Sequence, residues 1–456
     1  MKAVSKILAL SLVWLLTLAP AASAQEELSG PLSLEQCIDY ALQNNQMIKA
    51  TEIDKEMANA DVKVIRADGL PQINATASVA NNFIIPRVFV PADAFGGGGG
   101  APSDETVALE FGTDFNGDAG ISVTQMIFDG SFFVGLQAAR TYKELSEKNN
   151  IKTRIDVAAA VTKAYYSVLI NKELYQLYED EYRRVQRLHR DVTKMYEQGF
   201  SERIDVQRLQ VQVNNIATDL KRIGNTLNIS YQLLKFQMGL PDSQRIELAG
   251  DMGSISPELQ IEVYDDFDYG KRIEYSQLQT NQALAQLDLK NNKVKYIPSL
   301  NLFMNLGWNT GTNEFSQVFN FDNWVSSGTL GMRLNVPIFD GLRKSYMIQK
   351  NKLQIQQIDL YFDQMRNQID NEISQARAAL EVNVENMESQ KSNMEMAAEI
   401  YEVTIRKYQE GVGTNLEVLD ALREKRAAEN NYFAAIYDAI IAKVDYDKAT
   451  GSLYNP

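Results

Sequence analysis

The sequence has almost none of the side chains from which enzymes most often build metal sites and nucleophilic centres. Its 456 residues include one cysteine, Cys37, and one histidine, His189. A single cysteine cannot form an intrachain disulfide, and the two residues together cannot supply the ligands of the common zinc sites. Cys37 lies in an amphipathic pattern, so we expect it to be a small buried hydrophobic residue. His189 lies among charged residues and is expected on a solvated helix surface.

Sequence signals for cofactors and for catalysis are missing as well. The glycine run 96–100 lacks the preceding strand and following helix that a phosphate-binding loop requires. No arrangement of serine, histidine and aspartate can be argued, and no pair among the many carboxylates stands out. We therefore expect no enzyme, no cofactor and no metal site.

Basic charge and long apolar runs are also scarce. The chain has 45 lysine and arginine residues against 59 acidic ones, a net charge of −14, which disfavours binding to nucleic acid. Beyond residue 24 no apolar run is long enough to cross a bilayer as a helix. Residues 1–24 combine Lys2 and Lys6, an apolar run and a small-residue cleavage site. They are predicted to be a secretory signal peptide, with the mature chain beginning near Gln25.

An internal duplication is the most informative feature that is present. Three short motifs occur twice in the same order: Leu-Pro at 70–71 and Ile-Pro at 297–298, the segments 120–130 and 331–341 that each end in Ile-Phe-Asp-Gly, and Tyr-x-x-Gly at 196–199 and 408–411. The stretch between the second and third motifs has nearly the same length in both copies. We therefore predict repeat 1 over residues 25–260 and repeat 2 over residues 261–456.

Each repeat is predicted to contain an opening helix, two strands, a very long helix and a return helix. The helices are expected at 33–68, 131–198 and 201–238 in repeat 1 and at 264–296, 342–410 and 415–449 in repeat 2. The long helices contain no proline, and each would extend roughly 100 Å. Their apolar residues recur at spacings of three and four, which is typical of coiled-coil packing.

The strands are predicted from alternating apolar and polar residues. They are expected at about 71–84, 118–128, 299–309 and 326–339. Their lengths are close to the roughly 9–11 residues with which a tilted strand crosses a membrane. Because four strands cannot close a barrel, the barrel must be shared, and two, three or four copies are possible. The connections 85–116 and 309–323 are expected outside the cell, the first as a flexible or irregular loop without secondary structure.

The whole arrangement resembles the TolC-like family of outer-membrane efflux proteins over nearly all of residues 32–453. The resemblance is carried by the segment SLEQCIDYALQNN at 33–45, by the three doubled motifs and above all by YQEGVGTNLEVLD at 408–420. It implies an α+β membrane protein that forms a homotrimer in outer-membrane lipid. Its 12-stranded antiparallel β-barrel would continue as a long α-helical coiled-coil tunnel in the periplasm.

The resemblance also implies a function. The chain would be the outer-membrane channel of a tripartite efflux or type I secretion system, passively conducting drugs, ions or proteins. Its partners would be a periplasmic adaptor (membrane fusion) protein and an inner-membrane efflux pump or ABC transporter. The alternative, a structural or adhesive coiled-coil protein of the periplasm without a channel, explains the long helices but not the four matched strands.

Several residues near the predicted helix turns acquire roles from the same resemblance. Tyr196 and Gly199 in repeat 1, with Tyr408 and Gly411 in repeat 2, would form turns at the periplasmic tip that contact the adaptor.

Glu417 and Asp420 lie three residues apart on one helix face. They match acids that form rings around the periplasmic aperture, where they would attract cations. Without the resemblance they would be read as acids favoured in the first turn of a helix by its dipole.

Asp205 and Tyr408 match an aspartate and a tyrosine that link neighbouring helix pairs and hold the tip closed. Gly413 stands where the family has an arginine, so one part of this latch is missing. We expect the tip to be held more weakly here or by other pairs, with Arg203 or Arg208 as substitutes.

Overall fold

The computed structural model describes residues 30–91, 106–250 and 267–454. The predicted signal peptide and the glycine run at 96–100 lie outside these residues. The chain divides into two compact units at residues 41/42, 163/164 and 257/258. Unit 1 comprises residues 1–41 and 164–257, and unit 2 comprises residues 42–163 and 258–456.

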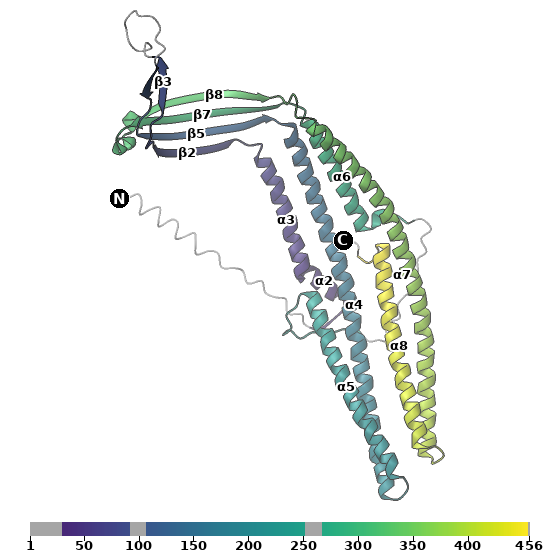
Figure 1. The fold of residues 1–456 in the computed structure, drawn as a ribbon. Helices are drawn as coiled ribbons and strands as arrows, with labels where there is room; N and C mark the ends of the chain where they lie inside the picture. Colours follow the sequence, from purple (N-terminus) through teal and green to yellow (C-terminus); the bar gives the residue numbers. More distant parts are fainter. Residues whose placement is uncertain (1–29, 92–105, 251–266, 455–456) are drawn as a thin grey trace, which may run out of the picture. The chain divides into compact units, whose positions relative to one another are not determined.

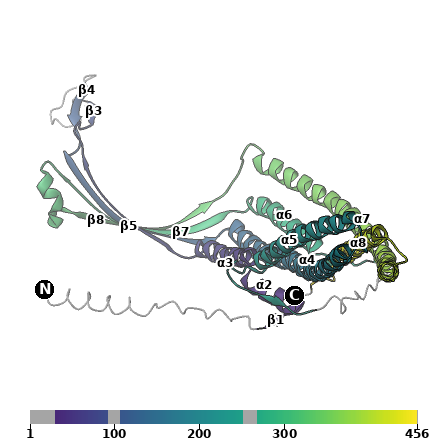
Figure 2. The same cartoon turned by 90° about the horizontal axis from the view of Figure 1, so that it is seen from below.

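Unit 2 contains a four-stranded antiparallel sheet. Its strands are β2 (Gln72–Asn81), β5 (Phe115–Phe128), β7 (Ser299–Thr312) and β8 (Val325–Asn335). The spatial order is β2-β5-β7-β8, so β2 and β8 are the edges (Figure 1). All three pairings are antiparallel, and the sheet bends along its strands (Figure 2).

The connection between β2 and β5 is not the irregular loop that the sequence suggested for 85–116. Strand β3 (Arg87–Pro91) pairs with β4 (Thr106–Glu110) as an antiparallel ribbon, and an Arg87–Glu110 ion pair of 2.6 Å joins its base. The prediction failed because the prolines and the glycine run dominated the segment. Pro91 is tolerated because it ends the strand, where its missing N–H costs little.

The connection between β7 and β8 contains two short 3₁₀ helices, η3 (Phe315–Phe319) and η4 (Phe321–Asn323).

Long helices make up most of unit 2. They are α3 (Gln46–Ala67), the first half of α4 (Gly130–Glu197), α6 (Ile273–Val294), α7 (Arg343–Gln409) and α8 (Asn415–Thr450). Helices α7 and α8 lie side by side (Figure 1), and Leu380 of α7 packs with Ala442 and Tyr446 of α8. Helix α8 buries an apolar stripe that includes Phe433, Ile440 and Val444.

Two opening helices differ from their predictions. The helix expected at 33–68 is broken into α2 (Leu34–Asn44) and α3, because Asn45 has an extended backbone and its side chain accepts a 2.8 Å hydrogen bond from the Met47 amide. This is an N-cap, which starts a new helix without disturbing the apolar spacing. The helix expected from 264 begins at Ile273, after the 3₁₀ turn η2 (Tyr269–Lys271) that Asp268 caps.

Unit 1 contains the second half of α4, helix α5 (Arg203–Met238) and the parallel pair β1 (Pro31–Leu32) and β6 (Glu247–Leu248). The Tyr165 hydroxyl of α4 donates to the Ala249 carbonyl beside this pair. Cys37 is fully buried, as expected, and burial raises the pKa of its thiol to about 12. No helix in the described parts of the chain is both long and apolar enough to cross a membrane.

Candidate functional site

The four-stranded sheet of unit 2 has one mainly apolar face. The antiparallel register aligns Leu302 with Met332 and Met304 with Leu330. On the other side of β7 the register aligns apolar residues of β5 and β2 on the same face. The remaining apolar residues of this face, taken over all four strands, are Ile73, Ala75, Ala77, Val79, Ala119, Ile121, Val123, Leu300, Leu306, Trp308 and Leu334. Within the described residues, Thr310 at the outer end of this face is buried, whereas much of the rest is open to solvent.

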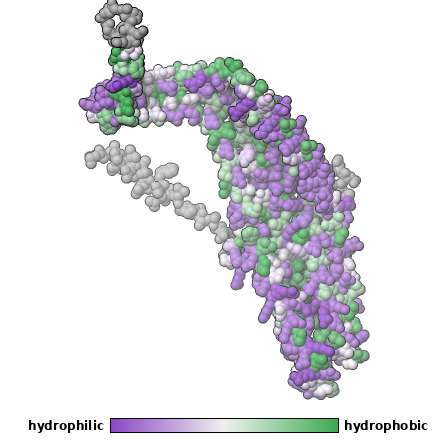
Figure 3. All heavy atoms as spheres, viewed as in Figure 1, coloured by the Kyte–Doolittle hydropathy of each residue, from purple (hydrophilic) through white to green (hydrophobic). Residues whose placement is uncertain are grey.

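Exposure shows how little of the chain covers the β8 edge. Leu330, Met332 and Leu334 are 70%, 71% and 63% exposed, although their type is normally buried. Hydrophobic atoms gather along the β8 edge of the sheet in Figure 3. A contiguous exposed apolar surface of this kind marks a membrane or protein contact.

The opposite face of the same sheet is polar. Its residues include Asn74, Thr76, Ser78, Asn116, Asp118, Ser122, Thr124, Asn301, Asn305, Asn309, Thr329 and Arg333. The alternation of the sequence is therefore kept in register across all four strands. Such a sheet can face lipid on one side and water on the other.

The Tyr-x-x-Gly turn of unit 1 ends α4. Gly199 has a positive φ of 82°, and its amide donates to the Tyr196 carbonyl at 3.0 Å. Glycine adopts this backbone conformation without a steric penalty, which explains why both turn motifs carry it. Helix α5 then begins, with Asp205 in its first turn.

The matching turn of unit 2 joins α7 to α8. Gly411 has a φ of 78°, and its amide donates to the Tyr408 carbonyl at 3.0 Å. A side chain at Gly413 would place its Cβ 3.2 Å from the Tyr408 backbone nitrogen. Gly413 is thus part of a tight turn, in which a larger residue would require the neighbouring backbone to shift by a few tenths of an ångström.

Glu417 and Asp420 lie together at the start of α8, as expected from their spacing. Thr414 and Glu417 form a capping box, in which each side chain accepts a 3.3 Å hydrogen bond from the other residue's amide. Asp420 is exposed and lies 3.3 Å from Arg423. The interpretation as first-turn acids is therefore seen directly for Glu417, whose carboxylate caps the helix.

The two predicted latch residues belong to different units. In unit 1, Asp205 accepts a hydrogen bond from Ser201 at 3.4 Å and lies 3.7 Å from Arg208. Tyr408 lies in the last turn of α7 in unit 2. Arg208 is therefore a local partner of Asp205 within α5, and its role in a latch stays a prediction.

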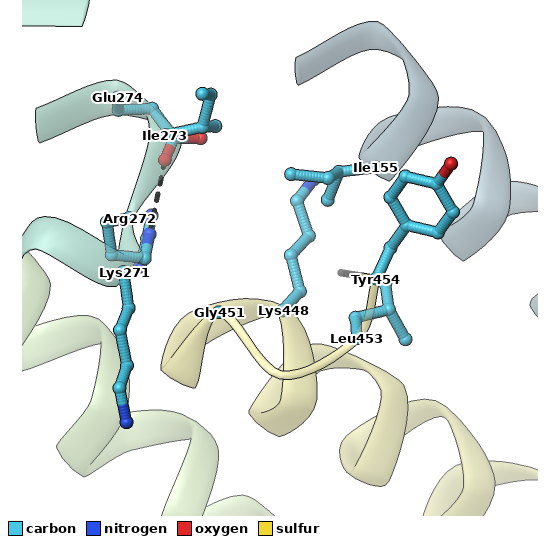
Figure 4. A pocket seen from close by; sticks show the side chains of 9 residues that line it. All are labelled: Ile155, Lys271, Arg272, Ile273, Glu274, Lys448, Gly451, Leu453 and Tyr454. Atoms are coloured by element: carbon cyan, nitrogen blue, oxygen red, sulfur yellow. Dashed lines mark hydrogen bonds and ion pairs between the residues drawn. The ribbon is translucent and has the colours of Figure 1, made fainter. Parts of the chain in front are cut away.

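A small pocket in unit 2 lies where α6, α8 and the C-terminal residues meet (Figure 4). It has about 20 Å³ of space accessible to water, room for about one water molecule. One lining residue, Arg272, binds the Ala449 carbonyl at 3.0 Å, Glu274 at 3.2 Å and Glu372 of α7 at 3.0 Å. Arg272 therefore forms a clamp that joins three helices, and the pocket beside this clamp is too small for a solute.

Within the described ranges no group of three or more histidine, cysteine, aspartate or glutamate residues could hold a metal ion.

Sequence reasoning missed three features of these regions. The capping box had a readable signal, Thr-x-x-Glu at 414–417. The clamp had none, because Arg272 meets partners about a hundred and more residues away in the chain. The stacking of Arg333 on Phe303, at 5.2 Å from the ring centre, becomes visible only when the register of β7 and β8 is known.

Comparison with known proteins gives the chain relatives over most of its length. Residues 37–239 and 271–452 match the family described as outer membrane efflux protein. In sequence the chain is similar to the probable efflux pump outer membrane protein TtgC of Pseudomonas putida, 20% identical over 425 residues that cover 92% of this chain and 83% of the relative. It is also similar to outer membrane protein TolC of Vibrio cholerae, 22% identical over 436 residues that cover 92% of this chain and 91% of the relative.

Among solved structures, the Campylobacter jejuni CmeC outer membrane channel has the same fold. The TM-score is 0.69 at 16% identity, over 92% of this chain and 86% of that one.

Proposed function

The chain belongs to the outer membrane efflux protein family, and from this premise we propose that it is the passive duct of a tripartite efflux or type I secretion system. It is an outer-membrane protein whose helical part lies in the periplasm. The proposal rests on the four-stranded sheet, which has one mainly apolar face, one polar face and two edge strands, β2 and β8, without an outer partner among the described strands. A chain that only served as a coiled-coil spacer would not need such a sheet.

The proposed barrel is closed by neighbouring copies. Among the described strands, neither β2 nor β8 has a partner on its outer side. A bilayer offers no water to satisfy these backbone groups, so both edges must be paired. Pairing β8 of one copy with β2 of the next leaves no edge, and the apolar face then turns toward lipid. Family membership favours three copies, which gives twelve strands.

The helical part supports the same assembly. Helix α7 buries few of its own side chains within the chain, and exposed apolar residues lie along its length: Leu353, Leu360, Val382, Met396, Ile400 and Val403. In the proposed trimer these side chains pack against helices of a neighbouring copy. The tunnel would continue the barrel into the periplasm.

Two long helical hairpins per chain support the proposed duplication. Helices α4 and α7 contain 68 and 67 residues, and α5 and α8 contain 36 each. Each hairpin, α4 with α5 and α7 with α8, follows two strands of the sheet in the chain. Its two helices are joined by one Tyr-x-x-Gly turn. The turns at Tyr196–Gly199 and Tyr408–Gly411 are the proposed contacts of a periplasmic adaptor, which links the duct to an inner-membrane pump or ABC transporter. The energy for transport would come from that partner.

At the periplasmic aperture, three copies would bring together three Glu417 and three Asp420 carboxylates. Close like charges at a narrow entrance raise the local concentration of cations and disfavour anions. The hydrogen bond that the Glu417 carboxylate accepts from the Thr414 amide in the capping box orients it at the start of α8.

The test is a single-channel recording of the mature protein in a planar bilayer. A trivalent cation added from the periplasmic side should block the current in the wild type and fail to block it in the double variant Glu417→Ala, Asp420→Ala. Glu402→Ala, which removes an exposed acid of α7, is the matched control and should be blocked like the wild type. A folded, inserted protein without any conductance would contradict the duct unless the latch variants open it.

The latch variants supply that further arm. In the proposed latch the Tyr408 hydroxyl would donate a hydrogen bond to the Asp205 carboxylate. Tyr408→Phe and Asp205→Ala each remove one side of this bond, so both should raise the conductance of the closed state. If both variants have unchanged conductance and the trivalent cation still blocks the current, the latch is refuted, whereas the acidic aperture is still supported.

A further inference from the structure

The sheet of unit 2 carries only two charged residues in its four strands, Asp118 on β5 and Arg333 on β8. Both lie on the polar face. The other polar-face positions are neutral, chiefly asparagine, serine, threonine and glycine. Each of the two charges therefore stands alone on a surface that is otherwise uncharged.

Arg333 is held in place by a specific contact. Its guanidinium carbon lies 5.2 Å from the centre of the Phe303 ring on the neighbouring strand. Phe303 is aligned with Gly331, where a Cβ would come within 2.7 Å of a ring atom. The glycine leaves the space that lets the ring lie against β8 and under the guanidinium, an arrangement that attracts a cation to the ring face.

No carboxylate in the described residues forms an ion pair with Arg333, which faces Asn301 across the strand pair. Asp118 is aligned with Asn309, so the two charges are eight residues apart along β7. At about 3.4 Å per residue the separation is about 27 Å, and the Debye length at physiological salt is about 8 Å. The two charges therefore act as separate sites and do not neutralise one another.

The strand order also places each charge at one end of the sheet. Arg333 lies two residues before the end of β8 that leads toward α7, and Asp118 lies near the end of β5 that follows the β3–β4 ribbon. The arginine is therefore at the helical end of the sheet and the aspartate at the opposite end.

We propose that Arg333, stacked on Phe303, is the anion-selecting residue of the duct's inner face. This inference rests on the proposed function, in which the polar face lines the lumen. Three copies would form a positive ring at the helical end of the barrel, which favours solutes bearing carboxylate or phosphate groups. The lumen would then have a second selectivity step, opposite in sign to the acidic aperture.

The experiment measures the reversal potential of single channels in a potassium chloride gradient, from which the ratio of potassium to chloride permeability follows. Arg333→Gln should raise this ratio about twofold or more, because it removes one positive charge per copy from a confined water-filled surface. Arg333→Lys should keep the wild-type ratio, since it keeps the charge. Asp118→Asn should lower the ratio.

Arg87→Gln, on the β3–β4 ribbon, is the matched control, because it removes an arginine that is already paired with Glu110. It should leave the ratio unchanged. An equal ratio in Arg333→Gln and Arg87→Gln, or a loss of the wild-type ratio in Arg333→Lys, would overturn the inference. If the wild type conducts and either of these two results is found, the duct is still supported and only the role of Arg333 is refuted. If the wild type and the latch variants insert but never conduct, the proposed function itself is refuted.

Discussion

The Arg272 clamp gives a prediction whose magnitude follows from its contacts. The side chain is 10% exposed and binds a buried carbonyl of α8 and two carboxylates, Glu274 and Glu372, which are 27% and 39% exposed. Arg272→Ala removes all three contacts at once. The buried hydrogen bond contributes about 1 to 1.5 kcal/mol, and each partly solvated ion pair adds about 0.5 to 1 kcal/mol. Together the three contacts predict a loss of about 2 to 3.5 kcal/mol.

The assay is guanidinium unfolding in detergent, followed by far-ultraviolet circular dichroism. Arg377→Ala is the matched control, because Arg377 lies on the exposed surface of α7 and pairs with Glu381 at 2.9 Å within one helical turn. Such a pair contributes about 0.3 to 0.5 kcal/mol. A loss in Arg272→Ala no larger than that in Arg377→Ala would show that the clamp does not stabilise the junction of α6, α7 and α8.

The same clamp predicts a pH dependence. Burial acts to raise the pKa of the Glu372 carboxyl, but hydrogen bonds from Gln368 and Arg272 outweigh it and hold the pKa below its ordinary value. A carboxyl with a lowered pKa stabilises the folded state above its ordinary pKa, and this contribution is lost as the pH falls through the lowered value. The difference in stability between wild type and Arg272→Ala should therefore shrink below about pH 4. A difference that grows on acidification would contradict this assignment.

Two further predictions concern single positions. Burial raises the pKa of the Cys37 thiol to about 12 from an ordinary 9.0. At pH 8 the thiol should therefore react with iodoacetamide about 1000-fold more slowly in the folded protein than in denaturant, because the thiolate fraction falls by about that factor. Rapid labelling of the folded protein, measured by mass spectrometry, would show that the site is open. Thr414→Ala should lower the free energy of unfolding by about 1 kcal/mol, because it removes the capping box. Thr404→Ala, within α7, is the control and should not lower it measurably in the same unfolding assay. Equal effects of the two substitutions would refute a capping role.

Much of the molecule was readable from local patterns. The long helices follow from a proline-free sequence with apolar residues at spacings of three and four, and four strands follow from strict alternation. The positive φ of Gly199 and Gly411 was implied by the Tyr-x-x-Gly motif, because glycine is the residue that ends helices in this way. These features depend on neighbours in the chain, so the order of residues alone determines them.

Features that depend on distant residues came only with the tertiary structure. Alternation identified the strands but could not supply the order β2-β5-β7-β8, which decides that two edges stay open. The stacking of Arg333 on Phe303 requires the register of two strands, and the Arg272 clamp joins residues about a hundred and more positions apart. The residue types in the sequence determined which charges and surfaces this protein has, whereas pairing across the chain decided which of them meet, because hydrogen bonds and stacking act only at contact distance.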